Sequence, residues 1–130
     1  MTEIPGWSVE EGTWAIARLA PSDPVPGWAA SGPFVCIART RDELSIVCPE
    51  SAVPPGVRAE RGWAMIKLAG PFPFDAVGVL EAVLAPLAHA SVSVFAVSTF
   101  DTDYVLVKRD DLERAVGALE GARRAGGAAK

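Results

Sequence analysis

The sequence predicts an α+β fold of two small units, each with an antiparallel sheet and with helices on one face of that sheet. Three observations support this prediction. Short runs of β-branched and aromatic residues are separated by turn residues, apolar residues recur at helical spacing in the second half, and the two halves resemble each other in pattern. A chain of 130 residues fits one ordinary domain, or two very small units fused together.

Composition restricts the partners of the chain. It has 12 basic and 16 acidic residues, a net charge of −4, which disfavours a nucleic-acid partner. The weakly charged stretch 82–100 is interrupted by Pro86 and His89, so we expect no transmembrane helix and no membrane partner. Residues 1–11 include acidic residues and no basic region typical of a signal peptide, which predicts a cytoplasmic protein.

Two cysteines, Cys36 and Cys48, fall in strands that would pair across the turn 40–43, so their thiols could be neighbours. No second pair of Cys or His lies at close spacing, and we therefore expect no metal site. Buried apolar side chains are the simplest role for the two cysteines, and a redox pair is the alternative. No glycine-rich phosphate loop is present, so no cofactor is predicted.

The first half predicts strands joined by short connections. A strand that follows a turn at Gly12 ends at the prolines from Pro21 onward, which deny the backbone donors that a longer ladder needs. Only a short helical turn near residues 28–31 fits before a hairpin around the charged turn 40–43. The expected strands cover residues 14–19, 34–39 and 44–48, and alternating residues over 4–12 indicate a first edge strand.

The second half predicts the same order with a full helix in the connection. After a strand over residues 62–70, Asp75 can cap a helix that begins at Ala76. Pro86 predicts a kink or an early end of this helix near Ala85. The apolar stripe of the helix consists of Val77, Leu80, Val83, Leu84 and Leu87.

A second hairpin and a last helix complete the chain. Strands are expected over residues 92–97 and 104–107. Asp110 or Asp111 is expected to cap the last helix, and Gly121 to stop it.

An internal repeat organises these elements. Three pairs of segments match, 14–19 with 63–68, 34–39 with 94–99, and 43–48 with 103–108. Each half therefore reads βαββ, which a further helix and strand would complete to the ferredoxin-like split βαβ fold. The predicted units are residues 1–61, with a truncated helical connection, and residues 62–122, followed by a flexible tail over residues 123–130.

Three segments resemble small bacterial ACT-domain proteins, residues 78–80, 86–88 and 98–107. The resemblance covers nearly the whole chain, and the paired arrangement is similar to the regulatory ACT domains of aspartokinases and of cellular arginine sensors. It implies a ferredoxin-like regulatory or sensing module that binds an amino acid where two ACT units meet.

The polar segment 98–103 places two carboxylates and two hydroxyls between two predicted strands. A solvated turn would explain this polarity. The alternative is that Asp103, with Asp101, binds the α-ammonium or a basic side chain of a ligand, while Ser98 and Thr99 offer hydroxyl hydrogen bonds. In the matched hairpin of the first half Glu43 keeps the negative charge but the Ser-Thr pair is missing, so we expect the site beside the second hairpin.

The loop 70–75 is the second candidate wall of the site. It leads into a helix whose first N–H groups attract carboxylates, and Gly70 would let a ligand approach the backbone. A tight proline-containing turn is the alternative. The resemblance implies that this loop is the ligand loop. The candidate ligand-binding residues are therefore Gly70, Pro71, Phe72, Phe74, Asp75, Ser98, Thr99, Asp101 and Asp103.

Two other functions stay open beside amino-acid binding. A small enzyme would use Asp101 and Asp103 as acid and base, but nothing nearby in the sequence supplies a nucleophile or a metal ligand set, and His89 lies near a helix end. A protein–protein interaction module without a ligand would pair an exposed sheet edge with a second copy. We predict a non-catalytic, homodimeric regulatory protein whose partner is an amino acid or a similar small ligand.

Overall fold

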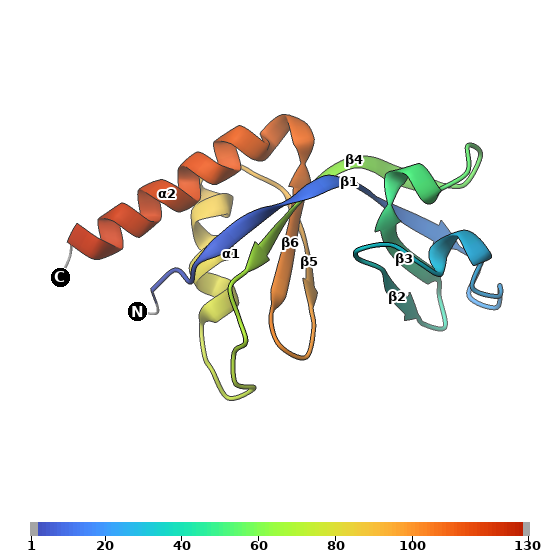
Figure 1. Cartoon of the computed structure of the whole chain (residues 1–130), viewed down its shortest axis with the longest axis horizontal. Coiled ribbons are helices and arrows are strands. Elements are labelled where there is room, and N and C mark those ends of the chain that lie inside the picture. Colours follow the sequence, from blue (N-terminus) through green and yellow to red (C-terminus); the bar gives the residue numbers. More distant parts are fainter. Residues whose placement is uncertain (1–2, 129–130) are drawn as a thin grey trace. The chain divides into compact units, whose positions relative to one another are not determined.

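The computed structural model describes residues 3–128 (Figure 1). In chain order the elements are β1 (Trp7–Leu19), a 3₁₀ turn (Gly27–Ala29), β2 (Cys36–Arg39), β3 (Leu44–Pro49), a 3₁₀ turn (Glu50–Ala52), β4 (Ala59–Leu68), α1 (Val79–His89), β5 (Val94–Ser98), β6 (Asp103–Lys108), a 3₁₀ turn (Arg109–Asp111) and α2 (Leu112–Ala128). Within the described range, neither helix has the length and apolar character needed to span a bilayer.

The α+β class is confirmed, but two separate sheets are not found. The six strands form one sheet in the order β2-β3-β1-β4-β6-β5, and the pairs β1 with β3, β2 with β3 and β5 with β6 are antiparallel. The sheet is continuous because β1 and β4 are 13 and 10 residues long, longer than expected. The predicted turn at Gly12 is wrong, since β1 continues through this glycine at φ 114°.

The chain divides into two compact units that share these long strands. The small unit is Glu11–Trp63, and the helical unit consists of the described residues on either side of that segment. The small unit contains 3₁₀ turns and no α-helix, because the prolines after β1 limit the first connection to the turn Gly27–Ala29. Each unit has its own buried core.

The core of the helical unit lies between its strands and both helices. Successive side chains of β4 and β6 point to opposite faces of the sheet, and both strands carry buried apolar residues on both faces. One face carries Ala64, Ile66, Leu68, Val105 and Val107. That face packs against the buried stripe of α1 and of α2, so both helices cover the same face of the sheet. The buried residues are Ala64, Ile66, Leu68, Val105 and Val107 from the strands, and Val83, Leu87, Ala115 and Leu119 from the helices.

Helix α1 begins one turn later than expected. Gly78 is its N-cap, in the left-handed conformation at φ 82°, and no side chain caps it, so the prediction that Asp75 caps the helix is wrong. The helix also continues past Pro86 to His89, and the predicted early end near Ala85 is therefore wrong. A proline in the second half removes one hydrogen bond, while the fully buried Leu87 still holds the last turn to the core.

Helix α2 likewise runs past its expected stop. Its bounds are Leu112–Ala128, so Gly121 does not end the helix and residues 123–128 continue it. A glycine inside a helix costs only about 1 kcal/mol, which the buried Ala115 and Leu119 side chains offset. Residues 129–130 of the predicted tail lie outside the described range.

The two cysteines are reduced and lie on opposite faces of the sheet. Cys36 is paired with Val47, and Cys48, the next residue along β3, is paired with Ala15. Successive side chains of a strand alternate between faces, so the two thiols point apart and a disulfide between them would need the sheet to rearrange. Cys48 belongs to the buried core of the small unit, as expected for an apolar role.

Candidate functional site

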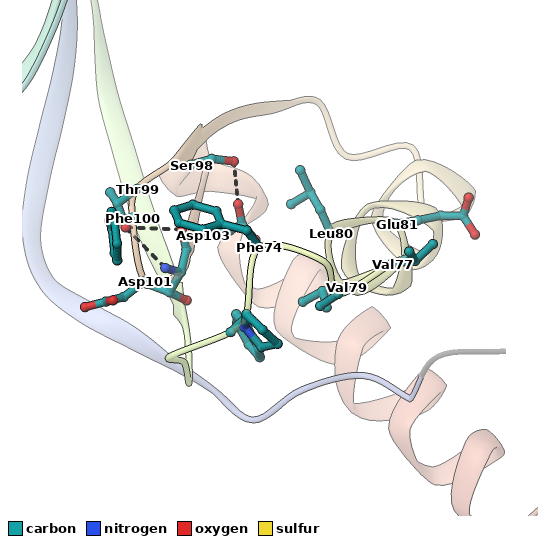
Figure 2. A pocket seen from close by; sticks show the side chains of 15 residues that line it. Phe74, Val77, Val79, Leu80, Glu81, Ser98, Thr99, Phe100, Asp101 and Asp103 are labelled. Carbon is teal, nitrogen blue, oxygen red and sulfur yellow. Dashed lines mark hydrogen bonds between the residues drawn. The ribbon is translucent and has the colours of Figure 1, made fainter.

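A cleft of about 520 Å³ opens in the helical unit (Figure 2). Its walls are the loop between β4 and α1, the start of α1, and the turn between β5 and β6. The lining residues are Phe72, Pro73, Phe74, Ala76, Val77, Gly78, Val79, Leu80, Glu81, Ser98, Thr99, Phe100, Asp101, Thr102 and Asp103.

The strand wall of the cleft carries a hydroxyl–carboxylate pair. Ser98 and Asp103 are the last paired residues of β5 and β6, and Ser98 Oγ donates a hydrogen bond to Asp103 Oδ1 (Figure 2). Asp103 shares a face with Val105 and Val107, which are buried under the helices. Strand alternation therefore points this carboxylate to the side of the sheet on which α1 lies.

The opposite wall is the start of α1, which supplies backbone donors. The first intrahelical bond is donated by the Ala82 N–H to the Gly78 carbonyl at 3.0 Å. The three preceding N–H groups, of residues 79–81, have no partner inside the helix and lie at the positive end of its dipole. No Lys, Arg or His lines the cleft, so these N–H groups are its means of attracting an anion.

Large apolar side chains surround the mouth of the cleft. Phe74 and Phe100 are 77% and 78% exposed and form an edge-to-face pair with ring centroids 4.8 Å apart (Figure 2). Val77 is 85% exposed. Apolar side chains gathered in this way on a surface mark a place where a ligand or a protein binds.

Six of the nine predicted site residues line the cleft, and three do not. Those in the cleft are Phe72, Phe74, Ser98, Thr99, Asp101 and Asp103. The other three, Gly70, Pro71 and Asp75, lie in the same loop but outside the lining. Thus the structure brings the polar hairpin and the aromatic part of the loop together.

Gly70 is needed for close packing between two chain segments. A Cβ at this position would lie 2.7 Å from the carbonyl oxygen of Asp101 and 2.9 Å from Cβ of Thr102. The loop after β4 can therefore approach the β5–β6 turn only because residue 70 has no side chain. In this structure the close approach at Gly70 is to Asp101 and Thr102, and the approach of a ligand to the backbone there stays a prediction.

The sequence prediction missed the helix start and Phe100 as parts of the site. A helix that starts at Ala76, as the sequence predicts, would contain residues 78–81 in its body. A signal was present, since Gly78 directly precedes an apolar run and Glu81 follows in the first turn, as is typical of a helix N-terminus.

The register of the two hairpins corrects the predicted correspondence between the halves by one residue. The last pair of β2 and β3 is Arg39 with Leu44, and the last pair of β5 and β6 is Ser98 with Asp103. Leu44, rather than Glu43, therefore occupies the position of Asp103, and it is fully buried. The small unit has no carboxylate at this position, and Arg39 takes the place of Ser98.

Comparison with known proteins agrees with this geometry. The family model described as ACT domain matches residues 58–121, which include every residue that lines the cleft. A second family model, described as an N-terminal domain, matches residues 12–56. Residues 58–121 belong to the ACT-domain family. The predicted resemblance is thereby confirmed.

Relatives of this ACT-domain protein include both sensors and solved structures. The rat cytosolic arginine sensor for mTORC1 subunit 1 is 35% identical over 124 residues, which is 83% of this chain and 37% of that protein. The chain thus spans little more than a third of the length of that relative. The crystal structure of protein Atu0741 from Agrobacterium tumefaciens is 42% identical, covers 94% of this chain and 91% of its own, and superposes with a TM-score of 0.89.

A more distant structure shares the ACT fold. The regulatory subunit of aspartate kinase from Thermus thermophilus matches with a TM-score of 0.63 and 14% identity, over 92% of this chain and 98% of its own. At this identity the likeness concerns the fold alone.

Proposed function

We propose that this ACT-domain protein is a non-catalytic regulatory module that binds an amino acid with a basic side chain in the cleft of the helical unit. The observation that carries the proposal is the chemistry of the two walls. One wall offers uncommitted backbone N–H groups at the start of α1, and the other offers the Ser98–Asp103 pair. A zwitterion needs both kinds of group, because its carboxylate accepts hydrogen bonds and its ammonium donates them.

The charge of the cleft favours a ligand that is positive overall. Glu81, Asp101 and Asp103 line it, and no basic side chain lines it. A second cation on the ligand would lie among carboxylates and beside the faces of Phe74 and Phe100, which attract cations. An acidic ligand would add a negative charge without a basic partner. The rat relative is named an arginine sensor, which supports the same class of ligand.

The wider proposal follows from the relatives. The name of the rat relative, a sensor, supports a regulatory role rather than catalysis. A cytoplasmic location and a homodimer remain proposals, the first supported by relatives that are named cytosolic. We also propose that residues 1–61 form a diverged ACT-like unit beside the ACT unit 62–122, because the turns of both hairpins have the same length between their last paired residues.

A thermal-shift screen with all twenty amino acids tests this function. A ligand that binds the folded state adds about 2.7 kcal/mol at 100 times its Kd, which corresponds to a rise in Tm of several degrees for a domain of this size. We expect arginine or lysine at millimolar concentration to raise Tm, and aspartate and glutamate to leave it unchanged. No shift with any amino acid would contradict the proposal.

An interaction module without a ligand is the second candidate, and the exposed Phe74, Val77 and Phe100 side chains favour it. Light scattering tests self-association in this second candidate. A strictly monomeric protein across the micromolar range would exclude self-association through this surface.

A further inference from the structure

Thr102 is a buried polar residue in the wall of the cleft. The residue is only 8% exposed, and its Oγ1 donates a hydrogen bond to the carbonyl of Leu68 at 2.9 Å. Leu68 is the last residue of β4, so this bond fixes the β5–β6 turn to the point where the loop of the opposite wall begins.

Two further contacts join the same turn to the same loop. The Phe72 N–H donates to the Asp101 carbonyl at 2.7 Å. Gly70 lies so close to Asp101 and Thr102 that a Cβ could not be added without a shift. The turn therefore meets the loop at three successive places, and the loop leads directly to the start of α1.

The turn itself is also held internally. The Thr99 N–H donates to the Thr102 carbonyl at 2.8 Å, and the Thr102 N–H donates to Thr99 Oγ1 at 3.3 Å. Because these bonds hold the turn closed, the hydrogen bond from Thr102 to Leu68 fixes the positions of the neighbouring Asp101 and Asp103 as well.

We propose that Thr102 is a positioning residue that sets the separation between the carboxylate wall and the helix-start wall, and with it the length of ligand that can contact both. The inference rests on the proposed function, since it concerns selectivity in the same cleft. Thr102 needs no contact with the ligand for this role. It acts through Asp101 and Asp103 on one side and through the loop of Phe72 on the other.

The expected effect follows from the populations of two arrangements. Two hydrogen bonds, from Thr102 Oγ1 to Leu68 and from the Phe72 N–H to Asp101, join the turn to the loop. Removal of the Thr102 hydroxyl leaves the second of these two. If the arrangement with both walls in place falls to about a tenth of the molecules, the apparent Kd rises about tenfold. Ligands of different length then lose affinity by different factors. The reason is that a cleft whose two walls are no longer held at one separation does not favour one ligand length.

The experiment has a part that needs no ligand. Amide hydrogen exchange at Phe72, measured by NMR in the free protein, reports directly on the bond to Asp101. We expect its protection to fall about tenfold in Thr102→Val relative to the amide of Ile66, and to be retained in Thr102→Ser, which keeps the hydroxyl. Gly70→Ala, a second variant, forces the same two segments apart by a clash and should have the same effect.

A matched control exists in the small unit. There Thr40 closes the equivalent turn, since its N–H donates to the Glu43 carbonyl at 2.9 Å and its Oγ1 accepts from the Glu43 N–H at 3.1 Å. Thr40→Val removes a turn hydroxyl outside the cleft, and Phe72 exchange should not change. Unchanged protection at Phe72 in both Thr102→Val and Gly70→Ala would overturn the inference.

The ligand part uses 2,4-diaminobutyrate, ornithine and lysine, which differ by one methylene at each step. One methylene in a fitted pocket changes affinity about 10- to 200-fold. We expect the wild type to prefer one length and Thr102→Val to reduce that preference, with Thr102→Ser restoring it. Faster Phe72 exchange with an unchanged preference would overturn the role in selectivity. Faster exchange in a protein whose wild type binds no amino acid would refute the proposed function and still support the structural role of Thr102.

Discussion

Replacement of Asp103 by asparagine is the substitution that most directly probes recognition of the ligand cation. Asparagine has nearly the same shape and can still accept the hydrogen bond from Ser98 Oγ, so the local structure should be preserved. What is lost is the charge on the side chain. Any fall in affinity therefore reports the electrostatic part of ammonium binding.

The size of the effect follows from the place of Asp103 at the start of β6. A hydrogen bond between charged groups contributes about 1.5–3 kcal/mol. Asp103 is half-buried in an open cleft, so solvent reduces this to the lower part of the range, about 1.5–2 kcal/mol. Because about 1.4 kcal/mol corresponds to a factor of ten, we expect Kd for L-arginine to rise about 10- to 30-fold.

Isothermal titration calorimetry with L-arginine measures this change, and Asp75→Asn is the matched control. Asp75 lies in the neighbouring loop, is exposed, and does not line the cleft. A screened surface charge of this kind should change Kd by about twofold or less. An Asp103→Asn variant that binds within twofold of wild type would refute the reasoning, as would equal losses in both variants.

Three predictions concern stability and thiol chemistry. Leu87 is fully buried between α1 and the sheet, so Leu87→Ala should lower the free energy of unfolding by about 2–5 kcal/mol in urea titrations, and a loss below about 1 kcal/mol would contradict this packing. Gly32 has φ 139°, and a Cβ there would lie 2.9 Å from Pro49 Cγ, so Gly32→Ala should cost more than about 1 kcal/mol, whereas Gly27→Ala meets no atom within 4 Å and should cost less. Burial raises the pKa of both cysteine thiols above 9.0, with Arg61 partly opposing this at Cys48. The folded state then binds the thiol protons more tightly than the unfolded state, so the free energy of unfolding is retained below pH 9 and falls as pH rises above it. Iodoacetamide should label the buried Cys48 only on unfolding. Labelling of Cys48 in the native protein, or stability that rises above pH 9, would contradict these expectations.

Local features of the fold were predictable from the sequence because they depend on nearby residues. The hairpin strand Leu44–Pro49 and the polar turn before Asp103 follow from alternating apolar residues and turn residues. The continuity of the sheet was not predictable, since periodicity does not say which strands pair over long distances. Gly12 read as a turn residue, yet the structure accommodates it inside a long strand.

The candidate site was predictable only where side chains carry the chemistry. Asp101 and Asp103 stood out as carboxylates between two strands. The N–H groups at the start of α1 belong to the backbone, and an error of three residues in the helix start placed them inside the helix. The predicted correspondence of Glu43 with Asp103 is wrong for a related reason, because a match of charge in the sequence does not reveal the register that hydrogen bonding sets.

An NMR titration of the protein with L-arginine tests binding in the cleft most directly. The amides of residues 79–81 are the groups that would donate to the ligand carboxylate, and the amide of Asp103 reports on the opposite wall. We predict saturable chemical-shift changes concentrated at these amides and at Phe74 and Phe100. Changes concentrated in the small unit, or no change at millimolar arginine and lysine, would contradict the proposed site.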